Sequence, residues 1–349
     1  MLKDIKEVEI LEDNFLNSLF TSANLQEINQ VCKVLNGSFY LDSFNYFPIN
    51  NKFHTFYQLF KKDDENSLDH FYTKQFYNNL LTKQNEFKTI KNSFVLGSSP
   101  ADNYFTNLLH FFPRIFFIKE KKINLIIHRN LSNKFRDFIK TICKIREIEV
   151  KFKFVDDDFY LFENSLIPQF FKINSSIKII KFFLDRLLSN IKAPEIGKRI
   201  YVRREDASYR KILNEADLIE SLRKNGFDII NPNHFEIINQ MKIFSNAEVI
   251  ISPYGSNLSN IIFCKKGTKI VEISPNFRNS YEVNISNRYN NIANYLGLDF
   301  HKITADTVDV QKHSNLAKKY IDQKILNGSD YYKNMILKMG EIEELINSL

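Results

Sequence analysis

Apolar runs of three to six residues alternate with amphipathic stretches through most of the chain after residue 92. The alternation is clearest between Lys198 and Pro275, where four such runs are separated by segments with helical spacing. Repeated strand–helix units predict a parallel sheet covered by helices. Residues 1–90 hold only short aromatic-rich runs between polar segments, so they give no comparable prediction.

The first half of the chain also predicts alternating strands and helices. Strands are expected at residues 94–97, 123–127, 150–155 and 159–162, and helices at residues 102–119, 133–144 and 175–191. Pro113 interrupts the first of these helices, because proline lacks the amide needed for helical hydrogen bonding.

The second half carries clearer boundary signals. Asn214 is expected to cap a helix that Gly226 ends in left-handed geometry. Asn233 with Glu236 resembles a capping box. The other expected elements are strands at 200–202, 227–230, 249–252, 269–273 and 300–303, a helix from Asn257, and a helix at 286–296 stopped by Gly297.

A chain of 349 residues suggests two domains. Residues 192–197 read as a linker, which predicts an N-terminal α/β domain at 1–192 and a C-terminal one at 193–310. Polar helices at 311–349 are expected to pack across both. The apolar face of the 175–191 helix would pack between domains or lie on a membrane surface.

Charge and cysteine content narrow the functional classes only partly. A net charge of +7 suits nucleic acid, anionic lipid, a phosphorylated ligand or an ordinary lysine-rich surface. Three scattered cysteines argue against a disulfide framework or a structural zinc site. No apolar run approaches the ~18 residues of a membrane span. These features predict a cytoplasmic protein.

Arginines gather where the 200–202 strand is expected to end. Arg203, Arg204 and Arg210 would present rigid forks of donors at the end of a parallel strand, where such sheets bind ligands. This pattern favours an anionic ligand such as a nucleotide diphosphate. The alternative is a solvated loop in which the arginines pair with Glu205 and Glu215.

A turn with a single glycine follows the 249–252 strand. Gly255 would let the backbone approach a ligand, and the amides of Ser256 and Asn257 would open the next helix, where anions bind. An ordinary strand–helix turn is the alternative. Arg203 and Gly255 would lie on one sheet, so the two signals support each other.

Motifs for metals and cofactors are almost absent from the sequence. Asp156–Asp158 contains a D-x-D, but acidic residues are common in loops, and no histidine pair has metal-ligand spacing. No Walker A, G-x-G-x-x-G or G-x-S-x-G pattern occurs. We therefore expect neither a metal nor a cofactor.

Several of these motifs, in this order, resemble glycosyltransferase family 61. Upstream, Asn103-Tyr104-Phe105 with Pro113-Arg114 resembles a further family stretch. Two positions depart from the family pattern, where Thr106 and Tyr254 stand in place of histidines. The matching positions are Arg203-Arg204, Arg210, Asn214-Glu215, Gly226-Phe227, Gln240 with Phe244, Tyr254 to Asn260, and Glu272 to Pro275.

The resemblance implies the GT-B fold, with two Rossmann-like domains facing a cleft. It implies an inverting, metal-independent transferase that uses a nucleotide sugar, with UDP as the first expectation. The base would be Asp102 or His110, which a helix would place on one face. Donor contacts are expected from Arg203, Arg204, Arg210, Asn214, Tyr254, Gly255, Ser256, Asn257, Asn260 and Glu272.

The composition and the resemblance together suggest a bacterial enzyme of surface polysaccharide synthesis. Its acceptor would be a glycan or lipid-linked glycan, with peripheral contact at an anionic inner membrane. One alternative is a relative that binds a glycan or nucleotide sugar without turnover, which the Tyr254 and Thr106 departures motivate. A nucleic-acid-binding protein is the other, and the regular strand–helix pattern argues against it.

Overall fold

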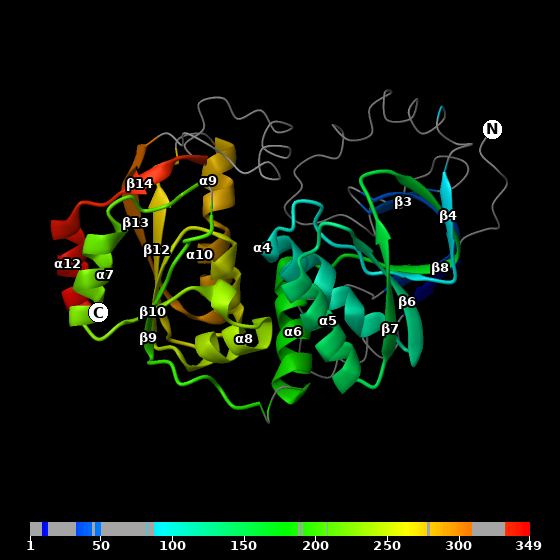
Figure 1. The fold of residues 1–349 in the computed structure, drawn as a ribbon, viewed down its shortest axis with the longest axis horizontal. Helices are drawn as coiled ribbons and strands as arrows, with labels where there is room; N and C mark the ends of the chain where they lie inside the picture. The colour runs from blue at the N-terminus through cyan, green and yellow to red at the C-terminus, as the bar shows by residue number, and fades with distance from the viewer. Residues whose placement is uncertain are drawn as a thin grey trace. The chain divides into compact units, whose positions relative to one another are not determined.

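A computed structural model describes residues 9–12, 33–43, 46–49, 82, 87–187, 189, 191–207, 209–277, 280–308 and 332–349. The chain divides into two compact units, Met1–Phe183 and Leu184–Leu349. Each unit contains its own sheet with helices packed on it (Figure 1). The α/β class predicted from the sequence is therefore confirmed. Among the described helices, none is long and apolar enough to cross a membrane.

The first sheet mixes parallel and antiparallel strands. Its central order is β1-β2-β8-β5-β6-β7, while β3 pairs with β2 and β4 pairs with β8. Strands β4, β5, β6, β7 and β8 run parallel, and β2 runs antiparallel to its neighbours. The strands are β1 (Glu9–Glu12), β2 (Lys33–Asp42), β3 (Phe47–Ile49), β4 (Lys88–Lys91), β5 (Phe94–Val95), β6 (Lys122–His128), β7 (Glu149–Val155) and β8 (Phe159–Pro168).

The backbone is irregular at neighbouring positions of this sheet, in β2, in β8 and between β4 and β5. Asn92, between β4 and β5, and Asn164 in β8 both have left-handed φ angles, of 49° and 47°. The Asn164 side-chain amide donates to the Asn92 side-chain oxygen at 2.6 Å. The β2–β8 register shifts just after Gly37, whose φ is 135°. Asparagine and glycine tolerate these angles better than other residues, so the sequence permits the irregularity here.

The helices of the first unit follow apolar spacing. Helix α5 (Asn133–Ile145) buries five side chains at helical intervals, and it connects the parallel strands β6 and β7. Helix α6 (Ile173–Leu187) spans the boundary between the two units. The buried face of α5 consists of Phe135, Phe138, Ile139, Ile142 and Cys143.

The segment predicted to be helical at residues 102–119 with an interruption at Pro113 is helical from Tyr104 to Phe117, and its helix type changes just before Pro113. The segment forms α4 (Tyr104–Thr106), the π-helix η1 (Asn107–Phe111) and the 3-10 helix η2 (Phe112–Phe117). The Phe112 amide donates to the Asn107 carbonyl five residues back, and Pro113 then has no amide to continue the pattern. Asp102 lies before α4 with a φ of 49°, so it is not part of any helix.

The second sheet has the order β10-β9-β11-β12-β13-β14, in which only the last strand is antiparallel. Figure 1 shows helices on both of its faces, with α7 and α12 on one side and α8 and α10 on the other. The strands are β9 (Arg199–Val202), β10 (Asp228–Ile230), β11 (Val249–Pro253), β12 (Lys269–Pro275), β13 (Asp299–Val308) and β14 (Asn334–Ile336). The helices are α7 (Glu215–Lys224), η3 (Pro232–His234), α8 (Ile237–Asn246), η4 (Ser256–Phe263), α9 (Ser280–Ser286), α10 (Arg288–Leu296) and α12 (Met339–Ser348).

Helix boundaries in the second unit confirm some capping predictions and correct others. Gly226 and Gly297 have left-handed φ angles of 73° and 67°, as expected for residues that end helices. The predicted cap at Asn233 is wrong, because Asn233 lies within η3 and α8 begins only after Glu236. The helix expected from Asn257 begins one residue earlier and is a 3-10 helix.

The left-handed angle at Asn164 predicts a specific stability effect. A β-branched residue is strained at this φ, so Asn164→Val should lower the free energy of unfolding by about 2 kcal/mol. Asn164→Gly removes the same bond to Asn92 without that strain, so it should cost less. Thermal melting followed by circular dichroism compares the two variants. Equal losses in both would assign the effect to the Asn164–Asn92 hydrogen bond alone.

Candidate functional site

The order in which strands are added to the second sheet reverses between β9 and β11. The chain passes from β9 to β10 on one side and then crosses to β11 on the other, so the order of the parallel strands reads 2-1-3-4-5. Open parallel sheets bind ligands outside the carboxyl ends of the two strands at such a switch point. Arg203 and Arg204 directly follow β9, and Tyr254 and Gly255 directly follow β11.

Arg204 crosses the switch point and packs against the backbone of Gly255. A Cβ atom at Gly255 would lie 1.6 Å from one guanidinium nitrogen of Arg204 and 2.7 Å from its Cζ. The φ of Gly255 is 175°, an extended angle that any residue adopts. A side chain at position 255 would therefore displace the guanidinium of Arg204, an arginine of the same site.

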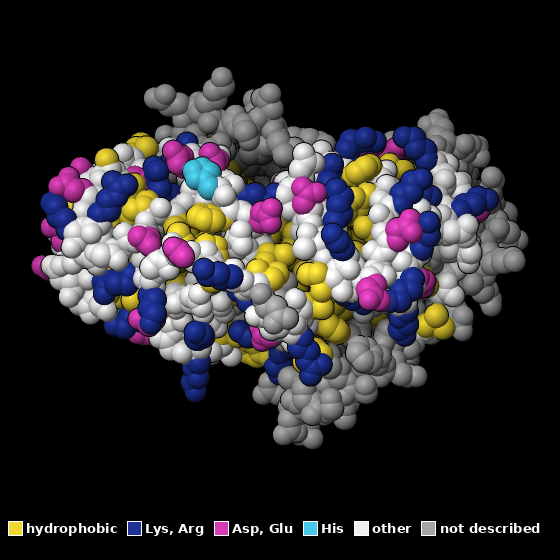
Figure 2. All heavy atoms as spheres, turned by 60° about the horizontal axis from the view of Figure 1, so that its bottom comes forward, with side chains coloured by type: hydrophobic (Ala, Val, Ile, Leu, Met, Phe, Trp, Pro, Cys, Tyr) yellow, Lys and Arg dark blue, Asp and Glu magenta, His cyan; other side chains and the backbone are white. Residues whose placement is uncertain are grey.

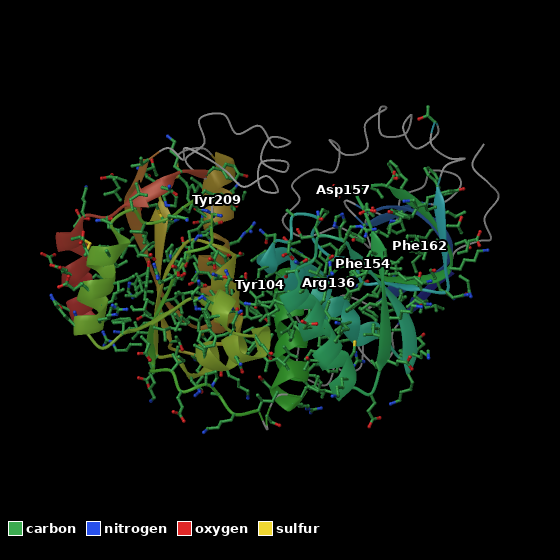
Figure 3. All side chains as sticks on the ribbon, in the orientation of Figure 1. Tyr104, Arg136, Phe154, Asp157, Phe162 and Tyr209 are labelled. Atoms are coloured by element: carbon green, nitrogen blue, oxygen red, sulfur yellow. The ribbon has the colours of Figure 1, made fainter. Side chains whose placement is uncertain are left out.

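Arg210 is held between two tyrosine rings. Its Cζ lies 4.8 Å from the ring centres of both Tyr209 and Tyr254, and the residue is 4% exposed. Figure 3 labels Tyr209 at the carboxyl-end side of the second sheet. Arg210 has a left-handed φ of 57°, and its amide donates to the Lys333 carbonyl at 3.0 Å. Cation–π contacts with both rings restrain the guanidinium.

Tyr254 itself is fully packed. Its ring contacts Phe277 and Tyr289 edge-on, with centroids 5.5 Å apart in each pair. Its hydroxyl donates to the Ile285 carbonyl at 3.1 Å. The hydroxyl is thus bound to the backbone of α9, and the ring supports Arg210.

Glu272 of β12 is a buried carboxylate behind these residues. It is 0% exposed, and its polar neighbour Ser274 favours the ionised carboxylate through a side-chain hydrogen bond. The ammonium of Lys302, which is paired with Glu272 in the register of β12 and β13, lies 3.9 Å away. Burial raises the pKa of Glu272 to about 8, although the charges of Lys302 and Arg210 oppose the shift.

Arg203 has carboxylate partners within the protein. It donates to Glu215 at 2.8 and 3.2 Å and to Glu205 at 3.3 Å. The Tyr201 hydroxyl donates to the other oxygen of Glu215 at 2.9 Å. Hydrogen bonding to Glu215 raises the pKa of Arg203, so its charge is secure. The ion pairing considered as an alternative from the sequence is therefore present, and it fixes Arg203 at the strand end.

These residues form one connected group, which we call the strand-end cluster: Arg203, Arg204, Arg210, Tyr254, Gly255 and Glu272. The sequence model of the family Glycosyltransferase 61 matches residues 70–271, more than half of the chain, and this range includes all of the cluster except Glu272. The chain belongs to glycosyltransferase family 61. No curated protein matches it. Family membership identifies a glycosyltransferase, and the cluster lies where such a sheet binds ligands.

Two polar residues of the family 61 motifs bind each other in the core. The Asn260 amide donates to the Gln240 side-chain oxygen at 3.1 Å. The Gln240 amide in turn donates to the carbonyls of Pro232 and Phe235. Asn260 is 0% exposed. It therefore ties η4 to α8 and, through Gln240, to the loop after β10, a structural role whose partner the sequence did not indicate.

Asn214 is also bound to the backbone. Its side-chain amide donates to the Leu337 carbonyl at 2.9 Å, and its oxygen accepts from the Leu337 amide at 3.0 Å. It precedes α7 but makes no side-chain cap. Ser256 and Asn257 begin η4, whose first amides have no acceptor within the helix.

The two candidate bases occupy different environments in the first unit. His110 is 2% exposed within η1, and its ring lies 5.9 Å edge-on from that of Phe105. Asp102 lies in the loop after β5, where it accepts from the Asn107 amide at 3.1 Å. Burial raises the pKa of Asp102 to about 6. Asp102 is the more accessible of the two.

The D-x-D segment is held by the protein. Asp156 pairs with Arg129 at 2.7 Å, and Asp157 lies 2.9 Å from the Nε2 atom of His128. Asp158 accepts from the Phe159 amide. Within the described residues, no group of three or more acidic, histidine or cysteine side chains has the geometry of a metal site.

Sequence reasoning missed Lys302 and Tyr209. The register places Lys302 directly beside Glu272, so a lysine within the predicted strand at 300–303 was the available signal. Tyr209 precedes Arg210 and stacks on it, but a single tyrosine in a loop carries no pattern from which this contact could be predicted.

The raised pKa of Glu272 predicts how stability depends on pH. The pKa of Glu272 is about 8 in the folded protein, above its ordinary 4.5. Its contribution to the free energy of unfolding is therefore complete below pH 4.5 and is lost as pH rises to and through 8. Glu272→Gln cannot ionise. Its stability relative to the original protein should therefore rise between pH 5 and pH 9, by on the order of 2–4 kcal/mol.

Thermal melting across this pH range measures the difference. Glu248→Gln, which changes an exposed carboxylate of the same unit, is the control. A constant difference between Glu272→Gln and the original protein at all pH values would show that Glu272 is ionised throughout.

Proposed function

We propose that this protein is an inverting glycosyltransferase that moves a sugar from a nucleotide-sugar donor to a glycan acceptor. The observation that carries the proposal is the strand-end cluster at the switch point of a parallel sheet in a family 61 chain. Arg204 and Arg210, from the loop after β9, both contact the turn after β11, and Arg203 lies at the end of β9, where Glu215 and Glu205 hold it. A diphosphate needs such a concentration of fixed donors.

In this reaction the acceptor hydroxyl oxygen attacks C1 of the donor sugar. The bond between C1 and the diphosphate oxygen breaks, and its electron pair leaves with the diphosphate. The acceptor proton passes to a base. Negative charge grows on the leaving group, and Arg204, Arg210 and the first amides of η4 would stabilise it. A single displacement inverts the configuration at C1.

Arg203 would contribute through its fixed position. Its bonds to Glu215 orient the guanidinium before any ligand arrives, and a donor phosphate would share it with that carboxylate. The side chains of Asn214, Tyr254 and Asn260 would act by supporting the cluster, since each is hydrogen-bonded within the protein. Glu272 would influence donor binding indirectly, through its charge interactions with Arg210 and Lys302.

The domain arrangement and cellular role that we propose follow from the family resemblance. We infer a GT-B arrangement, in which residues 1–192 serve the acceptor and residues 193–310 hold the donor. The expectation that residues 311–349 pack across both domains is not met by residues 332–349, which pack into the second unit, and residues 311–331 lie outside the described residues. The composition, rich in Asn, Lys, Ile and Phe, is typical of AT-rich genomes and supports a bacterial enzyme of surface polysaccharide synthesis. Such an enzyme would act in the cytoplasm or at the inner membrane.

Donor binding is the first test. A thermal-shift screen with UDP-, GDP- and CMP-sugars, in excess EDTA, should give a stabilising hit, because a ligand of the folded state raises the melting temperature. UDP-sugars are the first expectation. A hit that requires added Mn²⁺ would replace the arginine mechanism by a metal-dependent one.

A double-mutant cycle makes this test specific to the switch point. Arg204→Ala and Gly255→Ala should each weaken donor affinity about tenfold, because the methyl group at Gly255 displaces the same guanidinium. The double variant should bind like either single one. Arg223→Ala, on the exposed end of α7, is the control. Fully additive losses would mean that Gly255 contacts the ligand directly.

Asp102 is the proposed base, and its raised pKa gives a pH signature. A base must be ionised, so transfer should fall as pH drops through about 6. Asp102→Asn should lose on the order of 10²–10⁴-fold in rate while donor affinity stays intact. Asp137→Asn, an exposed change on α5, is the control. Normal transfer by Asp102→Asn would exclude Asp102 as the base.

Tyr254 supports a second candidate function. A histidine stands at this position in the family pattern, whereas the Tyr254 hydroxyl is bound to a backbone carbonyl. This favours a relative that binds a nucleotide sugar without turnover. The two functions separate in the same experiments, because a non-catalytic protein would give the thermal shift but no sugar transfer and no donor hydrolysis at any pH.

A further inference from the structure

A pocket of about 570 Å³ lies in the first unit, apart from the strand-end cluster, which belongs to the second. Lys88 and Lys91 of β4, Arg129 after β6 and Lys153 of β7 contribute to its lining, with Asp156 as the carboxylate. Four cations against one carboxylate leave a charge of +3 on the lining. Its size is that of a site for a small ligand, typically about 300–1,000 Å³.

Two of these cations form no ion pair with a described carboxylate. Arg129 pairs with Asp156 at 2.7 Å, and Lys91 pairs with Glu163 at 2.6 Å. Within the part of the chain that the structure describes, Lys88 and Lys153 have no carboxylate within ion-pair distance. Lys88 still acts on Asp156 through its charge, and the pocket presents a net positive charge to whatever enters it.

Next to this pocket, Phe152 and Phe154 form an apolar strip on one face of the edge strand β7, whereas Lys151 and Lys153 lie on its other face. The Arg136 guanidinium of α5 lies 4.7 Å over the Phe154 ring, and Lys140 lies 5.8 Å over Phe152. Figure 3 labels Arg136 and Phe154 side by side, and Figure 2 shows Lys and Arg side chains bordering hydrophobic ones on this unit. Phe154, at 38% exposed, belongs to both pocket and strip.

A chain of acidic sugars has the chemistry to match this surface. The C–H face of a sugar ring packs on an aromatic ring, whose faces carry negative charge density. Carboxylates or phosphates spaced along the chain would meet the lysines. A nucleic acid would need open aromatic faces for stacking of whole bases. Arg136 covers one face of Phe154 and leaves the other for a ligand, and in a chain of glycosyltransferase family 61 we expect that ligand to be a sugar chain.

We propose that this pocket and strip bind an acidic glycan, carrying carboxylate or phosphate groups, as the acceptor of transfer. The proposal rests on the function proposed above, since it names the class of acceptor. It concerns only residues of the first unit, so it can be tested without the donor.

The test is direct binding of the full-length protein to hyaluronan hexasaccharide, an oligogalacturonate and a phosphorylated oligomannose, with neutral maltohexaose for comparison. At least one acidic oligosaccharide should bind, and its affinity should fall with added salt, since screening weakens exposed charge pairs. Maltohexaose should bind at least tenfold more weakly. If no acidic oligosaccharide binds, or if maltohexaose binds equally well, the proposal fails.

Paired variants locate the site. Lys88→Ala with Lys153→Ala should weaken binding about tenfold or more, and Phe154→Ala should weaken it with no change of charge. Lys121→Ala with Lys122→Ala changes the net charge equally at the opposite end of β6, where both lysines pair with glutamates, and should leave binding intact. Equal losses in both double variants would reduce the effect to net charge and overturn the proposal.

Two further arms separate the outcomes. If phosphatidylglycerol vesicles or single-stranded DNA bind through Lys88 and Lys153 more tightly than any acidic oligosaccharide, the site serves a membrane or nucleic acid and the proposal is overturned. The donor thermal shift is measured in the same variants. A donor shift without glycan binding overturns the acceptor assignment alone, whereas glycan binding without any donor shift overturns the proposed transferase.

Discussion

The contact between Arg204 and Gly255 determines what the second sheet can bind. A parallel sheet with a switch point leaves space outside two adjacent strand ends, and here the missing side chain at Gly255 lets Arg204 fill part of it. The arginine comes from the strand on one side and the glycine from the strand on the other. Any side chain at this glycine would displace the guanidinium, so the two residues form one feature.

Buried charge is the second constraint, and its parts depend on one another. Arg210 lies between two aromatic rings, and Glu272 is fully buried. Ionising a carboxylate in such a place is unfavourable unless cations lie nearby, and here Arg210 and Lys302 oppose but do not cancel the effect of burial. An anion bound at the strand ends would compete with Glu272 for Arg210. The protonation of Glu272 and the binding of the donor are therefore expected to favour each other.

The sequence predicted the second unit better than the first, for physical reasons. In the second unit, buried parallel strands are short apolar runs, and glycines with left-handed angles mark where helices end. Residues 102–119 show the limit of this reasoning. Their apolar spacing and Pro113 predicted an interrupted helix, but not the π-helix and the 3-10 helix that form on either side of the interruption, where every residue from Asn107 to Phe117 is buried.

The sequence pattern predicted which site residues lie at strand ends. It did not predict which side chains they bind. Arg203 and Gly255 could be placed at strand ends from the pattern alone. Nothing in the pattern indicated that Asn260 would bind Gln240, or that both polar atoms of Asn214 would bind Leu337. Such contacts join segments 20 and 123 residues apart.

The bonds within the site have a consequence for how it would work without a metal ion. A flexible arginine loses side-chain entropy when it orders around a ligand, and that loss weakens binding. Here Glu215 holds Arg203, the rings of Tyr209 and Tyr254 hold Arg210, and the backbone of Gly255 contacts Arg204. The ordering is thus complete before a ligand arrives. Ion pairs that seemed from the sequence to compete with a ligand therefore contribute to its binding, because they fix the donors in place.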